Sequence, residues 1–277
     1  MNAQPSSDAG PAASVRSQAS AGEGAFPAAT LVTFPPSLDC ELARFLLTHY
    51  GVPYEEVRHT LIFSFFATWW DARTLHFPLL YGPGYPPLDT VQKIIDHLDP
   101  LASPERKLLP DGPDRAGVEA DWILFNARLG GSTAVFAYYH LLPHRDVMIR
   151  PLTDGVPAFE AMTVRAAYPL FAAFLTKILK LSAERAQAAL EEIRAIVQGV
   201  DGRLADGRSY LFGDRFTLAD MAFANALGPL VLPDNDGAPL PTLAEMPPVL
   251  QSVVAEMCGH PAGQFALRIY RERRGGK

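Results

Sequence analysis

The spacing of hydrophobic and polar positions divides the chain into a mixed first part and a helical second part. Short strands are predicted at residues 29–34, 53–61 and 77–81. Apolar residues recur at helical spacing over residues 38–50, 62–73 and 88–99. Residues 82–87 are rich in Gly and Pro and predict a turn or a partly stranded connection. The first part therefore reads strand, helix, strand, helix, strand, connection and helix.

A proline-rich segment at residues 100–113 predicts a linker, after which strand-like alternation almost disappears. Helical spacing dominates at residues 116–129, 158–181, 182–204 and 217–231. Gly130, Gly131 and Pro169 are expected to bend or break their helices, and residues 233–248 to form a long loop before a last helix. We therefore predict an α/β domain at residues 29–101 and an all-α helical bundle domain at residues 113–277.

Composition places this chain among globular proteins with a substantial core, since 48% of its 277 residues are hydrophobic. The formal net charge of -6 argues against a nucleic-acid partner, which would need clustered Lys and Arg. Residues 1–28 are rich in Ala, Ser, Gly and Pro and have no apolar core, so they predict a disordered tail rather than a signal peptide. No apolar run is long enough for membrane insertion.

The two cysteines, Cys40 and Cys258, are too few for a disulfide framework or a four-cysteine zinc site, and no C-x-x-C occurs. A reducing, cytoplasmic setting fits this usage best. His140 and His144 have the spacing of a helical ligand pair, but Pro143 intervenes and no H-E-x-x-H is present. We therefore predict no metal cofactor.

The stretch "SLDCELAR", residues 37–44, places a serine and a cysteine at a predicted helix start. Ser37 is a preferred N-cap, whose oxygen would accept the backbone N–H of Cys40. Its hydroxyl could also donate to an anion, such as a thiolate, held at the positive helix end. The helix end would lower the pKa of Cys40, whereas Asp39 and Glu41 would raise it, and apolar helical neighbours favour a buried thiol. These residues alone leave open whether Ser37, Cys40 or neither takes part in chemistry.

Two further short motifs allow both a structural and a binding interpretation. Pro78 either opens a strand as an ordinary trans residue or forms a cis bond that turns the backbone of Phe77 outward to pair with an extended ligand. Asp89 and Thr90 either cap a helix or bind an α-amino and carboxylate group at its N-terminus. Neither motif decides between its two interpretations.

The run "FSFFATWW", residues 63–70, holds more large apolar side chains than one helix face normally buries. A partner subunit or an apolar ligand could cover the excess. Four aromatic residues of the helical part are candidates for lining a pocket or for ordinary core positions: Trp122, Phe125, Tyr138 and Tyr168.

The spacing of Thr217 and Asp220 is that of a capping box, with Phe216 placed as a hydrophobic staple. We interpret this motif as a folding element rather than as a catalytic one.

Taken in order, these motifs resemble the cytosolic glutathione transferase superfamily over about Leu31 to Tyr270. "SLDCELAR" is similar to that family's helix start, "FPLL" to its V-P-V-L with the cis-proline, and "LDTVQKIIDHLD" to its E-S-x-A-I-x-x-Y-L. "YLFGDRFTLADMAFA" looks like the signature of its helical domain and is the most specific match. The resemblance implies a thioredoxin-like domain followed by the helical domain.

What the family implies can be carried onto matching positions. Ser37, or Cys40 as in the cysteine-using classes, would lie beside the sulfur of glutathione. The backbone of Phe77 before Pro78 would pair with the cysteinyl part of the tripeptide, and Asp89 with Thr90 would hold its γ-glutamyl end. The nearby cations for its glycine carboxylate are few: Arg73, His76 and Lys93.

The leading hypothesis is a homodimeric cytoplasmic glutathione transferase of detoxification, with glutathione as co-substrate and a hydrophobic small molecule as electrophile. A cysteine-dependent thiol transferase using Cys40 is one alternative. The other is a non-catalytic binding or interaction protein that keeps the fold and uses the aromatic run at residues 63–70.

Overall fold

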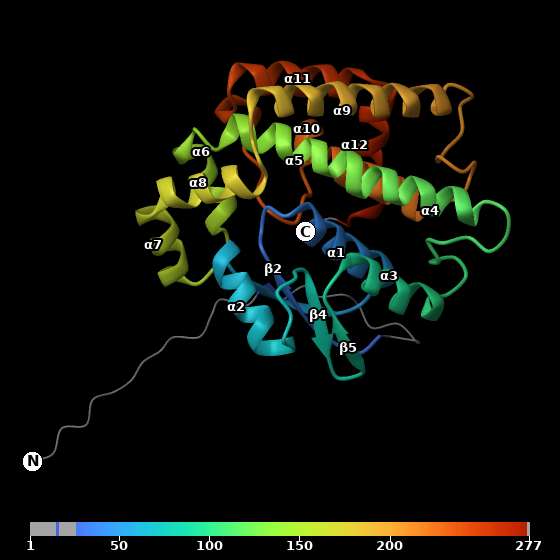
Figure 1. Cartoon of the computed structure of the whole chain (residues 1–277). Helices are drawn as coiled ribbons and strands as arrows, with labels where there is room; N and C mark the ends of the chain where they lie inside the picture. The colour runs from blue at the N-terminus through green and yellow to red at the C-terminus, as the bar shows by residue number, and fades with distance from the viewer. Residues whose placement is uncertain (1–14, 17–25, 276–277) are drawn as a thin grey trace, which may run out of the picture.

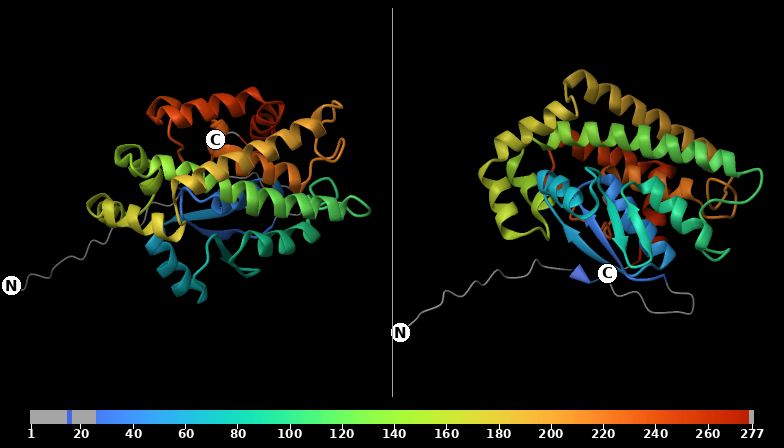
Figure 2. Two further views of the ribbon diagram at one scale, coloured as in Figure 1. Left: turned by 45° about the horizontal axis from the view of Figure 1, so that its top comes forward. Right: turned by 60° about the horizontal axis from the view of Figure 1, so that its bottom comes forward.

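The computed structural model describes residues 15–16 and 26–275. The tail predicted for residues 1–28 lies outside the described residues apart from 15–16 and 26–28. Figures 1 and 2 show a small sheet with three helices, and a larger set of helices that lies along one side of it. The α/β part followed by an all-helical part confirms the predicted fold class.

The sheet has the strand order β1-β3-β2-β4-β5. Its strands are β1 (Val15–Arg16), β2 (Ala29–Thr33), β3 (Tyr54–Arg58), β4 (Leu79–Gly82) and β5 (Tyr85–Leu88). β2 and β3 run parallel, and the other neighbours run antiparallel. The connection predicted at residues 82–87 is thus a hairpin, because Tyr85 pairs back to Gly82, whose φ of 150° suits glycine.

Three helices accompany the sheet: α1 (Leu38–Tyr50), α2 (Leu61–Ala72) and α3 (Val91–Leu98). α1 ends at Gly51, which adopts the left-handed conformation and donates its N–H to carbonyls of the last turn. α1 packs against α3 on one side and against the helical part on the other. Its residues Leu42, Phe45 and Leu46 are wholly buried between these layers, so α1 joins the two parts of the molecule.

The helical part contains nine further α-helices among the described residues, with a π-helical segment (Leu124–Leu129) between the first two. They are α4 (Arg115–Ile123), α5 (Gly130–Leu141), α6 (Arg145–Thr153), α7 (Ala158–Ala166), α8 (Tyr168–Ile178), α9 (Ala183–Leu204), α10 (Leu218–Val231), α11 (Pro248–Gly259) and α12 (Pro261–Arg273). α10 packs against α12, α11, α5, α4 and α1. It is therefore the central helix of this part.

The helix does not break at Gly130 and Gly131, although the π-helical segment ends directly before them. The helix continues through both glycines, and Gly130 has ordinary helical angles. A Cβ on Gly130 would contact Leu38 of α1 and Ala226 of α10 at 3.7 and 3.8 Å. The position thus lies where three helices approach closely.

Other helix boundaries differ from expectation in smaller ways. Pro169 stands in the first turn of α8, after a break at Ala167, as predicted. The chain after residue 247 forms two helices instead of one, with His260 between α11 and α12. α6 was not predicted, because Pro151 interrupts its apolar spacing.

The predicted capping box is present at the start of α10. Asp220 accepts hydrogen bonds from the Thr217 N–H at 2.7 Å and the Thr217 hydroxyl at 2.8 Å, and also from the Leu211 N–H at 2.7 Å. All of this lies in the interior. The motif therefore fixes both the helix start and the loop that precedes it.

Within the part of the chain that the structure describes, every helix is too short or too polar to cross a membrane.

Candidate functional site

Ser37 caps α1, as its position predicts. The strand β2 ends before Pro35 and Pro36, and the Ser37 backbone is extended, with φ -75° and ψ 129°. Its Oγ accepts the Cys40 N–H at 3.4 Å. Because that bond uses an oxygen lone pair, the hydroxyl can still donate a hydrogen bond to another acceptor. Ser37 also lines a large cavity, so its cap position and its access to a ligand coexist.

Cys40 lies one helical turn further on but faces the core. It is 0% exposed. Burial raises the pKa of its thiol to about 12, against the smaller lowering effect of Arg44. The thiol is therefore neutral near pH 7 and shielded from solvent.

The positions carried over from the resemblance come together in a smaller cavity of about 330 Å³. Phe77, Pro78, Asp89 and Thr90 all line it, and the Phe77–Pro78 peptide bond is cis. The remaining lining residues are Asp39, Phe65, Leu75, His76 and Val91. Residues directly before β4 and directly before α3 thus line the same cavity.

Asp89 is held in a defined orientation at the N-terminal end of α3. It accepts hydrogen bonds from Thr74 Oγ1 and Lys93 Nζ, both at 2.6 Å. Desolvation acts to raise its pKa, but these two donors outweigh it and hold the pKa below its ordinary value. Thr90 caps α3 by accepting the Lys93 N–H at 3.2 Å. Asp89 therefore stays ionised at neutral pH, with Lys93 as its partner. Sequence reasoning did not find Thr74, which lies in a loop without a motif.

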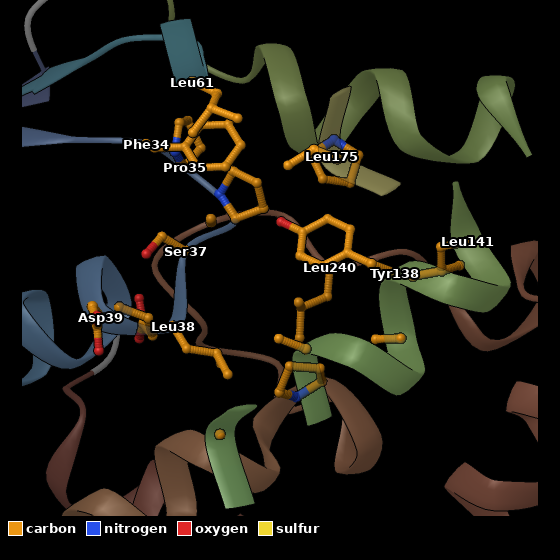
Figure 3. Close-up of a pocket in the computed structure, with 18 of the residues that line it drawn as sticks. Phe34, Pro35, Ser37, Leu38, Asp39, Leu61, Tyr138, Leu141, Leu175 and Leu240 are labelled. Atoms are coloured by element: carbon orange, nitrogen blue, oxygen red, sulfur yellow. The ribbon is translucent and has the colours of Figure 1, made fainter. Parts of the chain in front are cut away.

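The larger cavity has a volume of about 540 Å³ and adjoins the smaller one. Asp39, Phe65 and Phe77 line both. Phe77 packs against Phe34 and Phe65, with ring centroids 5.9 and 5.4 Å apart. Figure 3 shows Ser37, Leu38, Leu61 and Leu175 around this space. Residues from the loop after β2 and from α1, α2 and α8 thus surround one largely apolar cavity next to Ser37.

Tyr138 is the one polar aromatic side chain among the cavity's lining residues. Figure 3 shows its hydroxyl directed across the chamber toward Pro35. Burial raises its pKa, so the phenol stays protonated and can donate a hydrogen bond. Of the four aromatic candidates, Trp122, Phe125 and Tyr168 are core residues and do not line this cavity.

The loop at residues 233–248 contributes a wall that sequence reasoning missed. Asp236, Ala238 and Leu240 line the large cavity from this loop, and Leu240 is visible in Figure 3. The segment has no helical or strand periodicity, so only its tertiary packing reveals it. The prolines of this segment were the sole sequence signal, and they predicted only a loop.

In the described residues, no cluster of three or more His, Cys, Asp or Glu side chains stands close enough together to hold a metal ion.

Comparison with known proteins places this geometry in a wider context. Residues 183–251 match the family model described as the C-terminal domain of glutathione S-transferase. No curated protein matched the chain.

Solved structures of glutathione transferases share the arrangement over most of the chain. A glutathione S-transferase from Sinorhizobium meliloti is 17% identical with a TM-score of 0.53, covering 87% of this chain and 93% of its own. A delta-class glutathione transferase from Nilaparvata lugens is 15% identical with a TM-score of 0.54, covering 89% and 90%. A glutathione S-transferase I bound with lactoylglutathione is 16% identical with a TM-score of 0.50, covering 87% and 99%. At these identities the likeness shows the fold.

Proposed function

We propose that the protein is a glutathione transferase-like enzyme, because it has the glutathione S-transferase fold and residues 183–251 match the model of that family's C-terminal domain. Its reaction joins the glutathione sulfur to a hydrophobic electrophile. We propose further that it acts as a homodimer in the cytoplasm, with detoxification as its role. One observation carries the proposal: the four positions expected to hold glutathione line a single cavity that opens beside Ser37.

Glutathione would extend from the smaller cavity toward the larger one. Asp89 stays ionised and faces the smaller cavity, so it suits the α-amino group of the γ-glutamyl end. The Thr90 region at the start of α3 offers a positive helix end to the carboxylate beside that amino group. The cysteinyl part would then pass Phe77, and the sulfur would reach the chamber shared with Ser37.

Ser37 would stabilise the thiolate by donating a hydrogen bond from its hydroxyl group. The helix N-terminus adds the partial positive charge of its backbone N–H groups. The sulfur attacks the electrophilic carbon, a carbon–sulfur bond forms, and the leaving group departs with the electron pair of the broken bond. The thiol proton goes to solvent. The Tyr138 hydroxyl, which points across the cavity toward Pro35, would donate a hydrogen bond to the departing atom.

The burial of Cys40 favours Ser37 over a cysteine-dependent thiol transfer. A nucleophilic or glutathionylated cysteine must be a thiolate that meets the substrate, and Cys40 is enclosed and neutral. The thiol-transferase alternative therefore requires α1 to move.

The non-catalytic alternative rests on the outer face of α2. Trp70 is 80% exposed and Phe66 65% exposed, with Trp69 and Ile62 beside them. An exposed aromatic surface of this kind is typical of contact with a partner or an apolar ligand. Phe65, by contrast, lines the cavities and belongs to the proposed enzyme site.

A calorimetric and kinetic comparison of three proteins tests the enzyme hypothesis. We expect the wild type to bind glutathione, and Ser37→Ala to bind it with a similar Kd but to lose about 100-fold in kcat, the typical cost of one removed thiolate or oxyanion donor. Ser182→Ala is the matched control, because Ser182 caps α9 with the same hydrogen bond at 3.2 Å and does not line the cavities.

Absence of glutathione binding in the wild type would remove the enzyme hypothesis. Gel filtration of a variant with polar residues at Phe66, Trp69 and Trp70 then decides the alternative, which predicts loss of assembly or of ligand binding.

A further inference from the structure

The charged side chains that line the large cavity are all acidic. They are Asp39, Glu41 and Asp236, and none of the lining residues is Lys, Arg or His. The rest of the wall is apolar or neutral. A ligand placed there meets negative charge in a low-dielectric surrounding, where charge interactions are strong.

Glu41 is already neutralised by the protein. It accepts from Arg274 Nε at 2.7 Å, from Arg44 Nη1 at 3.2 Å and from the Gly237 N–H at 2.9 Å. The Glu41 carboxylate therefore has little capacity left to accept hydrogen bonds from a ligand. Its role is to support the wall of the cavity.

The network around Glu41 is balanced without Asp236. Three arginines, Arg44, Arg58 and Arg274, pair with three carboxylates, Glu41, Glu56 and Asp154. Each arginine thus has an acidic counterpart in this network. Asp236 adds a fourth carboxylate, which makes the cluster one negative charge in excess when it ionises.

Asp236 accepts one hydrogen bond, from the Ala238 N–H to its Oδ1 at 3.0 Å. Within the described residues, no Lys, Arg or His forms an ion pair with it. Its position is set by Gly237, whose N–H donates to Glu41 and whose C=O accepts from Arg58 at 2.7 Å. A side chain on Gly237 would overlap Glu41 and Arg44. The loop therefore packs against the ion-pair network, and Asp236 has a defined position among the residues that line the cavity.

Asp39 adds a second acidic group at the Ser37 end. It is exposed to the cavity in the first turn of α1, and burial raises its pKa while a hydrogen bond with Asn126 lowers it. The chamber thus carries an acidic group on α1 and another on the 233–248 loop, with apolar walls between them.

Building on the proposed function, we propose that the large cavity selects electrophiles that carry a cationic group, such as an ammonium, and that Asp236 pairs with this charge. The apolar walls accept the hydrocarbon part of such a molecule. An ion pair made inside the cavity gives Asp236 the counter-charge that the arginine network does not supply. An anionic electrophile would instead be repelled by both Asp39 and Asp236.

The ionisation of Asp236 gives the preference a pH dependence. Burial, and then Glu41, raise its pKa to about 7, against lowering by Arg44 and Arg274. Tyr270 of α12 also faces it. A bound cation favours the ionised form, so binding near pH 7 releases a proton. Below about pH 6 the carboxyl is mostly protonated and the preference for a cation should fall.

Binding of three unreactive ligands that differ in charge tests the inference separately from catalysis. We would titrate the full chain with para-tert-butylbenzylammonium, the neutral para-tert-butylbenzyl alcohol and the anionic para-tert-butylbenzoate at pH 7.5. We expect the ammonium to bind about 10- to 100-fold more tightly than the alcohol, the range of a charge-assisted contact, and the benzoate most weakly.

Asp236→Asn should abolish the difference between ammonium and alcohol, since the amide keeps the bond from Ala238 but loses the charge. Asp234→Asn is the matched control, because Asp234 is an exposed acid of the same loop that does not line the cavity. In the wild type, calorimetry in two buffers of different ionisation enthalpy should detect the released proton, which needs no variant.

Equal binding of ammonium and alcohol by the wild type, or a preference that survives in Asp236→Asn, would overturn the inference. These results leave glutathione binding untouched, so the two proposals fail separately. Tight ammonium binding without glutathione binding would support the cation site and contradict the proposed transferase function.

Discussion

Ser37 and Cys40 show how two residues in one helical turn can have opposite surroundings. Ser37 caps α1 at the cavity wall and can still donate a hydrogen bond, whereas Cys40 points into the core. The helix start lowers the free energy of a nearby anion, but only a residue that faces the cavity shares this effect with a ligand. Which of the two residues can contact a ligand is decided by where its side chain points, not by its residue type.

Thiol reactivity tests this difference at the residue scale. Burial raises the pKa of Cys40 from 9.0 to about 12, so its thiolate fraction should fall about 1000-fold relative to an exposed thiol. In a Cys258→Ser variant, we expect an aromatic disulfide reagent to modify the folded protein very slowly and the unfolded protein rapidly. Cys40→Ser is the matched control, because it leaves only the half-buried Cys258.

Rapid modification of Cys40 in the folded Cys258→Ser variant would contradict the buried assignment, and protection by glutathione would then favour the cysteine-dependent alternative.

At the scale of single elements, helix starts carry most of the site. Capping residues begin α1, α3 and α10, but the three caps lie in different environments. Ser37 and Thr90 border cavities, whereas the Thr217 and Asp220 box lies wholly inside the helical part. The same local motif therefore predicts a helix start reliably, and its environment decides whether a ligand can use it.

The buried capping box should matter far more for stability than an exposed one. Asp220→Ala removes an acceptor for three buried donors, and we expect a loss of about 2–4 kcal/mol in the free energy of unfolding. Glu245→Ala is the matched control, because Glu245 makes the same bonds to Thr242 at the surface. There the donors can turn to water, so we expect about 0.5–1 kcal/mol. Urea denaturation measures both, and equal losses would contradict the argument.

On the scale of the whole molecule, an ion-pair network joins the sheet part to the C-terminal end of the chain. Arg274 follows α12 and donates to Glu41 of α1, and Arg58 of β3 donates to Asp154 after α6 and to Gly237. The large cavity lies against this junction, because Glu41 and Asp236 line it. The network therefore fixes the position of α1 relative to the 233–248 loop, which lie on two sides of the cavity.

Breaking one pair should weaken the whole molecule. Arg274→Met leaves the buried Glu41 with less compensation, and we expect a loss of about 3 kcal/mol in the free energy of unfolding. Arg271→Met is the control, because Arg271 lies in the same helix end but is exposed. Its denaturation midpoint should not change measurably. A wild type that unfolds in two separate transitions, or an Arg274→Met variant as stable as Arg271→Met, would show that the junction is weak.

Local patterns along the sequence were sufficient for the fold class, for most strands and helices, for the helix caps and for the resemblance that implies a glutathione site near Ser37. They suffice because caps, turns and apolar periodicity act within a few residues, which the chain specifies by itself. The continuous helix through Gly130, the strand pairing of β5 and the second helix after residue 247 depend on distant contacts. So do the burial of Cys40, the Thr74 bond to Asp89 and the unpaired Asp236. A side chain's solvent exposure, pKa and counter-ions are set by segments far away in the chain, and only the tertiary structure brings those segments together.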